Sequence, residues 1–439
     1  MKKRMFLSGV LLALLFAGLG VWALKTSAGT PGDDDSAYAN IQVFTRVLQL
    51  IRQDYVDEKK TGYRDLTYAA MRGMVDSLDP HSQFMEPDDF KSMEDDTNSE
   101  FGGLGMNVTL KDGYLTIISP VEGSPAYKAG LLPNDQILKI NGTSTERMDL
   151  GGAIRLLHGD AGQKITLTIY RPATKELKDY NLTREVIKVE SVKDAKLLDA
   201  ALTGEFKIGY VRITQFNKPT ADELAKKLDE LEGKGMQALV IDLRFNPGGL
   251  LNSAVDVCAQ FLPPHTLVVS TEGRAESQKH AYYTEEEVDP AHKAKQRKYP
   301  VAILINGSSA SGAEIVAGAL KDLNRAVLVG ETTFGKGSVQ SVIQLPDGSA
   351  LRLTTAHYYT PSHSIIHEHG VEPNIRATFT AEQEHQIIMQ RREDDAGESE
   401  KVDPDFHDTQ LERAADALKG VMIYTEKVTP KSEQKTSVN

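Results

Sequence analysis

The sequence predicts a multidomain α/β protein with a helical N-terminal arm, a compact middle domain of short strands and two helices, and an α/β domain that ends in C-terminal helices. Three observations support this fold class. Apolar residues recur at helical spacing between residues 41 and 78, short apolar runs separated by glycine turns fill residues 101–184, and buried strand patterns alternate with amphipathic helices from residue 207 onward. A length of 439 residues allows two or three such domains.

The N-terminal residues have the pattern of an export signal. Lys2, Lys3 and Arg4 precede an apolar run over residues 5–24, which is long for a cleaved signal peptide and near the minimum for a membrane span, so both interpretations remain open. We expect an exported protein, in the bacterial periplasm or on the outer face of the inner membrane. The expected organisation is residues 1–24 as signal peptide or signal anchor, 25–36 as a linker, 37–97 as the helical arm, 98–187 as the middle domain, 188–380 as the α/β domain, 381–424 as C-terminal helices and 425–439 as a disordered tail.

The α/β domain contains one unit that is suited to catalysis. An apolar strand Val301–Ile305 is followed by small polar residues, a helix from about Gly312 to Asn324 and a second strand Ala326–Val329. Ser311 therefore lies at a helix N-terminus, where backbone N–H groups and the helix dipole stabilise negative charge on a substrate oxygen. Taken alone, such a serine is usually only a helix cap.

A serine nucleophile needs a base, and the candidate is Lys336. Gly335 and Gly337 leave space around it, and a lysine becomes a base when desolvation lowers its pKa. If residues 337–343 form a strand, Gln340 faces the same side as Lys336, and its amide would orient the lysine amine. A glycine-flanked lysine alone is usually a solvated turn residue, and a strand glutamine usually faces water. Here all three candidates fall around one strand–helix–strand unit, at the edge where α/β sheets place ligands.

Two sequence runs resemble the carboxyl-terminal processing proteases of peptidase family S41. They are Ser309-Ala310-Ser311-Gly312-Ala313-Glu314-Ile315 and Gly330-Glu331-Thr332-Thr333-Phe334-Gly335-Lys336-Gly337-Ser338-Val339-Gln340. The resemblance implies that Ser311 is the nucleophile, Lys336 the general base and Gln340 its orienting partner. The family often has Ala and Ser where this chain has Gly312 and Ala313.

The resemblance also implies an oxyanion site. Residues 238–243 have the pattern of a buried strand, and they run into Arg244-Phe245-Asn246-Pro247-Gly248-Gly249. A phosphate-binding interpretation of the glycine pair is disfavoured, because the lysine and Ser/Thr of a P-loop are missing. In the family, a glycine of this loop and the residue after the nucleophile donate N–H groups to the oxyanion, which implies Gly248 or Gly249 together with Gly312. Which glycine of the pair donates stays open.

The middle domain resembles a PDZ domain. Its short strands, tight turns and two helices have the order found in that domain. In PDZ domains a glycine-containing loop before the second strand binds the C-terminal carboxylate of a peptide, so the resemblance implies that Gly103, Leu104 and Gly105 do so here; a plain tight turn is the alternative. These proteases often have an arginine that couples peptide binding to the active site, and this chain has His158 there, which suggests weaker or pH-dependent coupling.

Composition argues against several classes of protein. The net charge is −12 and the sequence has no Lys/Arg cluster outside the N-terminal tip, which argues against nucleic-acid binding. Cys258 is the only cysteine, and its apolar helical setting predicts a buried residue rather than a reactive thiol. The neighbouring histidines at positions 357, 363, 367 and 369 could suggest a metal, but the resemblance implies no metal and no other cofactor. Their main alternative role is a Ser-His mechanism in place of the lysine base.

These features together predict an exported serine endopeptidase that binds protein C-terminal tails through its PDZ domain and hydrolyses peptide bonds with a Ser/Lys dyad through an acyl-enzyme. Protein or peptide substrates are the expected partners, and an adaptor protein and homo-oligomerisation remain open. The amphipathic helix over residues 411–422 packs either on a second subunit or on its own domain. The alternative function is a non-catalytic PDZ scaffold or adaptor, which the presence of both Ser311 and Lys336 disfavours. A penicillin-binding type of enzyme is disfavoured because the Ser-x-x-Lys signature is missing around Ser311.

Overall fold

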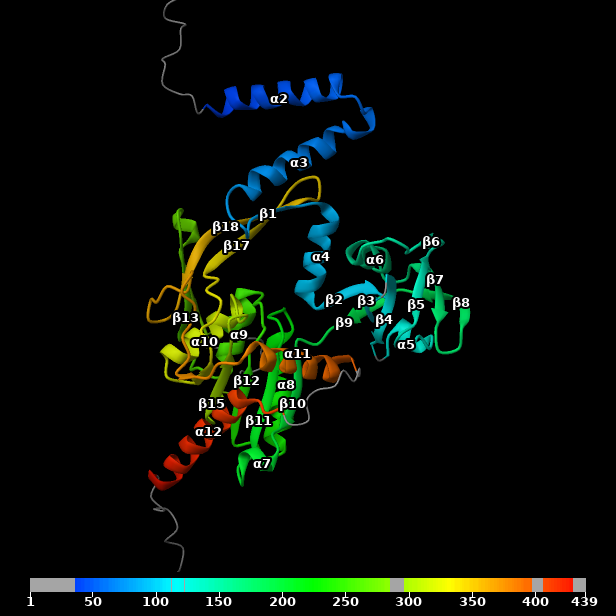
Figure 1. Cartoon of the computed structure of the whole chain (residues 1–439). Coiled ribbons are helices and arrows are strands. Elements are labelled where there is room, and N and C mark those ends of the chain that lie inside the picture. Colours follow the sequence, from blue (N-terminus) through cyan, green and yellow to red (C-terminus); the bar gives the residue numbers. More distant parts are fainter. Residues whose placement is uncertain (1–35, 112, 122, 285–295, 397–405, 429–439) are drawn as a thin grey trace, which may run out of the picture. The chain divides into compact units, whose positions relative to one another are not determined.

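The computed structural model describes residues 36–111, 113–121, 123–284, 296–396 and 406–428 (Figure 1). The chain divides into two compact units, residues 1–78 and 79–439. The predicted signal segment, nearly all of the linker that follows it and the end of the C-terminal tail lie outside the described residues. Within the described ranges, no helix is long and apolar enough to cross a membrane.

The first unit contains two helices, α2 (Ala37–Asp54) and α3 (Tyr63–Asp76), joined through the short 3-10 helix η1 (Glu58–Lys60). None of the residues of α2 is buried, so its predicted apolar stripe is exposed in this chain.

The second unit begins with β1 (Gln83–Met85) and α4 (Pro87–Asn98) and continues into an antiparallel sheet with the strand order β3-β4-β5-β7-β8. β3 is an edge strand of this sheet, and β2 pairs with β9 outside it. Alternating strand residues such as Ile117, Ile137 and Ile165 form the core of this domain. Its elements are β2 (Glu100–Gly103), β3 (Met106–Lys111), β4 (Tyr114–Pro120), α5 (Pro125–Lys128), β5 (Gln136–Ile140), β6 (Thr143–Ser144), α6 (Leu150–Leu157), β7 (Lys164–Arg171), β8 (Glu176–Thr183) and β9 (Glu185–Lys188).

The α/β domain is built on a sheet with the strand order β10-β11-β12-β15-β16-β19, which is parallel except for the edge strand β10. The parallel strands β11, β12, β15, β16 and β19 follow one another across the sheet in sequence order. The elements are β10 (Val192–Leu197), α7 (Ala200–Thr203), β11 (Ile208–Ile213), α8 (Thr220–Gly233), β12 (Ala238–Asp242), α9 (Leu251–Ala259), β15 (Val301–Ile305), α10 (Gly312–Asp322), β16 (Val327–Gly330) and β19 (Ile375–Arg376).

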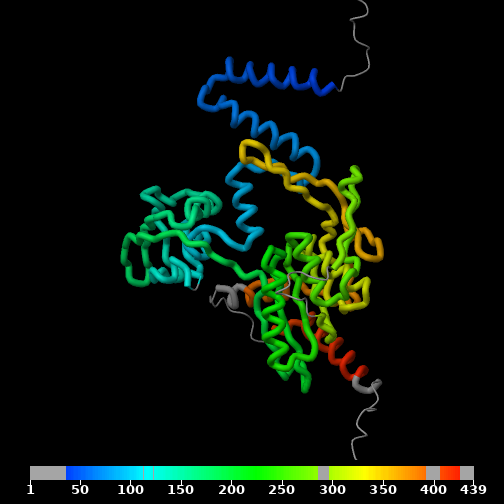
Figure 2. The backbone as a smooth tube through the Cα atoms, turned by 180° about the vertical axis from the view of Figure 1, so that it is seen from behind, coloured from blue at the N-terminus to red at the C-terminus, as the bar shows by residue number. Residues whose placement is uncertain are grey.

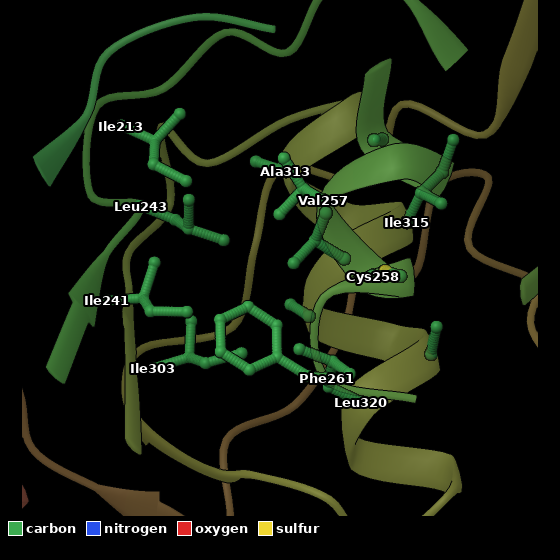
Figure 3. Close-up of a cluster of buried hydrophobic side chains, with 14 of the residues drawn as sticks. Ile213, Ile241, Leu243, Val257, Cys258, Phe261, Ile303, Ala313, Ile315 and Leu320 are labelled. Carbon is green, nitrogen blue, oxygen red and sulfur yellow. The ribbon is translucent and has the colours of Figure 1, made fainter. Parts of the chain in front are cut away.

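Both faces of this sheet are covered by helices of the same chain. On one face, Ile241 and Ile303 pack in a cluster with α8, α9 and α10, and Figure 3 shows strand side chains directed toward residues of α9 and α10. Cys258 lies in this cluster and is fully buried, and burial raises the pKa of its thiol far above the usual range, so the prediction of a buried, unreactive cysteine is confirmed. On the other face, Val240 and Leu304 pack against the C-terminal helix α12.

The C-terminal helices are α11 (Ala381–Ala396) and α12 (Thr409–Val428). The apolar residues Ala414, Ala415, Leu418 and Met422 of α12 are buried against the parallel sheet, so this helix covers its own domain. Helix α12 continues to residue 428, so the first residues of the segment 425–439 are helical.

A second sheet is built around β18 (Ala350–Tyr359), which pairs antiparallel with β17 (Ser338–Gln344), β13 (Leu267–Gly273) and β1. Figure 2 shows β17 and β18 as a long hairpin in yellow and orange. A hairpin forms because the turn around Asp347 and Gly348 joins the two strands directly, so they pair with each other. The remaining elements are η2 (Glu276–Gln278) and β14 (His280–Tyr283), which pairs with β13.

Candidate active site

Three loops meet at the carboxyl ends of the parallel strands β12, β15 and β16. They are residues 243–250, 306–311 and 331–337, and they contain the predicted oxyanion glycines, Ser311 and Lys336 respectively. Backbone hydrogen bonds join the loops: the Ala310 N–H donates to the Asn246 carbonyl at 2.9 Å, and the Phe334 N–H donates to the Ser309 carbonyl at 3.0 Å. This is the edge at which ligands bind in open α/β sheets.

Ser311 is the N-cap residue of α10, as predicted, and its backbone is unusual. Its φ and ψ are 52° and −115°, a combination that a residue with a side chain adopts only when the surroundings impose it. Such strain in a non-glycine residue costs about 1–3 kcal/mol and is concentrated at functional sites. The side chain is partly exposed, while Ala310 before it and Gly312 after it are buried.

Glu314 connects the segment of Ser311 with the segment of Lys336. Its side chain is fully buried on the first turn of α10. One carboxylate oxygen accepts the backbone N–H groups of Ser311 and Lys336, each at 2.8 Å. The other accepts the Gly335 N–H at 2.7 Å and the Thr333 hydroxyl at 2.5 Å. Sequence reasoning assigned no role to Glu314, although Ser-x-x-Glu is the spacing of a capping box and would have indicated the first of these bonds.

Lys336 is half-buried in this site. Burial lowers the pKa of its amine, the positive charge of Arg352 lowers it further, and the carboxylate of Glu314 acts in the opposite direction. A lowered pKa is what a lysine base requires. Among the described residues, no hydrogen bond joins the Lys336 amine to the Ser311 hydroxyl. Tyr358, a fully buried residue of β18 that sequence reasoning did not identify, donates its hydroxyl to the Lys336 carbonyl.

Gln340 lies on β17, next to β18. Its amide nitrogen Nε2 donates to the Ser338 hydroxyl at 2.8 Å and to the Thr354 hydroxyl at 3.4 Å. The described structure gives it no hydrogen bond to Lys336. The predicted alternation between positions 336 and 340 is disturbed because the pairing of β17 with β18 shifts register between Val339 and Gln340.

The loop after β12 places two glycines beside Ser311. Gly248 and Gly249 have φ values of 100° and 143°, and an added Cβ would lie 2.5 Å from the Ser311 Cβ at Gly248 and 2.2 Å from the Phe216 carbonyl oxygen at Gly249. Glycine is therefore required at both positions. The Gly248 N–H already donates to the Asn246 side chain at 2.8 Å, whereas the Gly249 N–H is paired with no acceptor in the described part of the chain. Gly249 is exposed, and its nitrogen lies 3.5 Å from the position of a Cβ on Gly312.

The base of this loop is held by buried charges. Asp242 is fully buried and accepts hydrogen bonds from Arg244 Nη2 at 2.7 Å and from Arg391 Nη2 of α11 at 2.6 Å. Burial opposes ionisation, but the two guanidinium groups hold the pKa of Asp242 well below its usual range. Arg391 also donates to the Arg244 carbonyl at 3.1 Å and lies 5.0 Å from the ring centroid of Phe245. Helix α11 thus contacts the loop directly.

The histidines near the site form a pair rather than a metal cluster. The rings of His357 and His367 lie 4.5 Å apart, and the Nδ1 atoms of both are buried without a hydrogen-bond partner. No group of three or more His, Cys, Asp or Glu side chains in the described residues is arranged to hold a metal ion. Within the same ranges, no histidine side chain hydrogen-bonds Ser311, as is also true of the Lys336 amine.

A small apolar groove lies in the middle domain between β3 and α6. Its volume is about 30 Å³, and its lining includes Leu104, Gly105, Met106 and Ile154. Leu104 and Gly105 of the predicted peptide-binding loop thus reach the groove. Gly103 instead ends β2, where it pairs with Glu185 of β9. The adjacent β3 is an open edge to which a peptide strand can pair.

His158 closes one end of this groove. Its ring stacks on Phe101 with centroids 4.6 Å apart. Burial lowers the pKa of His158, while the negative charge of Asp96 acts in the opposite direction. Positive charge at the end of α6 comes from Arg184, which donates to the carbonyls of Leu156 at 2.8 Å and Leu157 at 3.0 Å.

Comparison with known proteins agrees with the predicted family and fold. The model of peptidase family S41 matches residues 207–377, and a PDZ domain model matches residues 116–171. The carboxy-terminal-processing protease of Bartonella bacilliformis is 38% identical over 381 residues, which are 85% of this chain and 82% of that protein. The carboxy-terminal processing protease CtpA of Bacillus subtilis is 36% identical over 333 residues, 76% of this chain and 68% of that protein. The solved structure of a photosystem II D1 C-terminal processing protease is 28% identical with a TM-score of 0.44, over 77% of this chain and 92% of that one.

The two family models and the curated relatives define a serine peptidase with a PDZ domain. The chain belongs to the carboxy-terminal processing proteases of peptidase family S41. The predictions of the family, the fold class and the serine-type peptidase activity are therefore confirmed.

Proposed function

We propose that this protease is an endopeptidase that uses Ser311 and Lys336 as a catalytic dyad and proceeds through an acyl-enzyme. The observation that carries the proposal is the Glu314 carboxylate, which binds the backbone N–H groups of both residues at 2.8 Å and so fixes the strained serine beside a lysine of lowered pKa.

In the proposed reaction, the Ser311 oxygen attacks the scissile carbonyl while the neutral Lys336 amine takes the hydroxyl proton. The N–H groups of Gly249 and Gly312 stabilise the oxyanion; Gly249 is preferred to Gly248 because the Gly248 N–H is already bonded to Asn246. Lys336 then protonates the leaving amine, the C–N bond breaks, and the acyl group remains on the serine. Water, deprotonated by Lys336, attacks the acyl ester and releases the new carboxylate and the free serine. Gln340 orients the lysine amine throughout.

We also propose that the groove beside Leu104 and Gly105 binds the C-terminal tail of a protein substrate, as the PDZ fold supports. The N-terminal basic and apolar residues support export to the bacterial periplasm or to the outer face of the inner membrane. The exposed apolar stripe of α2 is suited to homo-oligomerisation. Digestion of intact spheroplasts with an external protease tests the location, and light scattering of the purified chain tests the subunit count.

The experiment that tests the dyad is the cleavage of an unstructured protein with an apolar C-terminus. The parent chain, Ser311→Ala and Lys336→Ala are compared, with Lys298→Ala as the control because Lys298 is an exposed lysine of the same domain. A second substrate that lacks its last residues tests the tail. Loss of cleavage in both dyad variants, normal cleavage by the control and weaker cleavage of the shortened substrate are the expected results.

Other outcomes contradict particular parts of the proposal. If Lys336→Ala keeps full activity, a different base operates, and His357→Ala and His367→Ala become the next variants to compare. If the shortened substrate is cut as well as the intact one, the PDZ domain does not recruit the tail. If the parent chain binds the substrate without cutting it, the alternative of a peptide-binding scaffold or adaptor, or the need for an adaptor protein, takes precedence.

A further inference from the structure

The turn at the start of the second unit, residues 79–82, is organised by one carboxylate. Asp79 accepts the His81 N–H at 2.7 Å, the Ser82 N–H at 2.8 Å and the Ser82 hydroxyl at 2.7 Å. Burial raises the pKa of Asp79, but these hydrogen bonds outweigh it and lower the pKa to about 2. Asp79 is therefore ionised at neutral pH and acts only as a hydrogen-bond acceptor.

This turn is bound to the strand beside the candidate base. Strand β1 follows it immediately and pairs with β18, where Gln83 lies opposite Arg352. The Thr354 N–H donates to the Ser82 hydroxyl at 3.0 Å, and the Thr354 hydroxyl donates to Asp79 Oδ1 at 3.2 Å. On the neighbouring strand β17, Gln340 is the register partner of Thr354. A chain of contacts thus runs from Asp79 through Thr354 to Gln340.

The direction of these hydrogen bonds is fixed by charge. An ionised carboxylate has no proton to give, so the Thr354 hydroxyl must use its single proton toward Asp79. Its oxygen is then an acceptor on the side of Gln340, and only the amide nitrogen can face it. The contact of Gln340 Nε2 with Thr354 at 3.4 Å is long, but a shorter bond of the same nitrogen to the Ser338 hydroxyl, at 2.8 Å, agrees with this orientation. The amide oxygen Oε1 makes no hydrogen bond within the described ranges.

We propose that Asp79 is a positioning residue that acts through Thr354 to set the orientation of the Gln340 amide, leaving the amide oxygen for the Lys336 amine. This inference rests on the proposed Ser/Lys mechanism and adds a residue to it. When the amide oxygen faces the Lys336 amine, Gln340 accepts a hydrogen bond from an N–H group of that amine. The lone pair of the amine nitrogen is then left for the Ser311 hydroxyl. With the amide reversed, its NH₂ group would compete with Ser311 for that lone pair.

The orientation of the amide also affects the pH dependence of catalysis. Charged or titratable groups that act on Lys336 come from three other elements: Glu314 on α10, Arg352 on β18 and His81 in the turn. An amide oxygen stabilises the ammonium form more than the neutral amine, so its loss lowers the pKa of Lys336. The midpoint of the rise of kcat with pH should then move to lower pH, while the plateau falls because the amine is no longer held toward Ser311.

The test compares Asp79→Ala, Thr354→Val and Thr354→Ser across pH in the full chain. The control is Asp199→Ala, which removes a carboxylate that also accepts a backbone N–H, from Ala201 at 2.9 Å, at the start of α7. Asp79→Ala and Thr354→Val should each lower the plateau kcat by about tenfold, leave KM within about twofold and shift the midpoint to lower pH. Thr354→Ser, which keeps the hydroxyl, and the control should behave as the parent chain.

The double variant Thr354→Val with Gln340→Ala tests whether Thr354 acts through Gln340. The proposal predicts that this variant is no slower than Gln340→Ala alone, because residues that act through one another have non-additive effects. Additive losses would overturn it, as would parent-like kcat in Asp79→Ala and Thr354→Val, or a fall in kcat with no shift of the midpoint, which is the signature of lost folded protein. Lys336→Ala belongs in the same series. If it stays active, the dyad itself fails; if it is inactive while Asp79→Ala behaves as the parent, only this inference fails.

Discussion

At the scale of single residues, the site depends on a buried carboxylate that has no catalytic proton to transfer. Glu314 accepts four hydrogen bonds, from the Ser311, Gly335 and Lys336 backbones and from Thr333, and no cationic side chain hydrogen-bonds it among the described residues. Its pKa is raised by burial, while these hydrogen bonds act in the opposite direction. Because the buried Glu314 carboxylate is surrounded only by hydrogen-bond donors, it specifies the positions of all four donors.

Glu314→Gln should therefore damage both folding and catalysis. The amide of the glutamine would direct an NH₂ group at N–H donors on one side, which leaves buried donors without acceptors. Each unsatisfied group lowers the free energy of unfolding by about 1–3 kcal/mol. We expect a lower free energy of unfolding in urea and a kcat at least about tenfold lower in the protein that remains folded. Glu230→Gln, at an exposed glutamate of α8, is the control. A Glu314→Gln chain with the kcat of the parent would contradict the role of the carboxylate.

Sequence reasoning was most effective for side chains whose position follows from one element. Ser311 was placed at the start of α10 because the apolar stripe of the helix fixes where it begins. The side of β17 that Gln340 faces was harder to predict, because the register shift after Val339 depends on pairing with β18. Tyr358 was missed because its hydrogen bond to the Lys336 carbonyl joins two separate segments of the chain, and no local pattern marks such a contact.

At the scale of elements, helix α11 supports the loop that supplies the proposed oxyanion donor. Arg391 binds Asp242, the Arg244 carbonyl and the face of Phe245, and Phe245 has a φ of 62°, which a non-glycine residue adopts only under constraint. The helix itself was predictable, but this function was not. Helical periodicity identifies an apolar face without identifying the surface that the face or its flanking arginine contacts.

Arg391→Ala should impair the oxyanion site more than substrate binding. Without the guanidinium, the Arg244 carbonyl loses a donor and the loop gains freedom, so we expect kcat to fall by about tenfold with KM within about twofold. Arg376→Ala, an exposed arginine of β19, is the matched control. Guanidinium ion added to the Arg391→Ala chain should restore part of the rate. An unchanged kcat would show that α11 is not needed to hold the loop.

At the scale of the whole molecule, one chain combines a peptide-binding domain with a peptidase domain. The middle domain has an open edge strand, β3, beside its groove, and the peptidase domain gathers its three functional loops at one edge of a parallel sheet. This organisation could be read from the sequence, because each domain has its own periodicity. The assignment of β18 to a second sheet could not, since periodicity identifies a strand but not the sheet that it joins.

Gly105→Ala should separate tail recognition from catalysis. Gly105 has a φ of 69°, and an added Cβ would lie 2.3 Å from the Ser124 Cβ, so the loop beside the groove must move. We expect a higher KM for a substrate with its C-terminal tail and no change for a substrate without it. Gly142→Ala is the control, because Gly142 has a φ of 81° and no atom within 4 Å of an added Cβ. Equal effects on both substrates would contradict a tail-binding role for this loop.

The most direct test of the central claim is to label the full chain with a fluorophosphonate, which phosphonylates activated serines with loss of fluoride, and to map the adduct by mass spectrometry across pH. The account predicts an adduct on Ser311 that forms faster as pH rises, since the base is the neutral amine, and that levels off above the lowered pKa of Lys336. Lys336→Ala should label at least about tenfold more slowly. Labelling at a residue other than Ser311, or an unchanged rate in Lys336→Ala, would contradict the Ser/Lys mechanism.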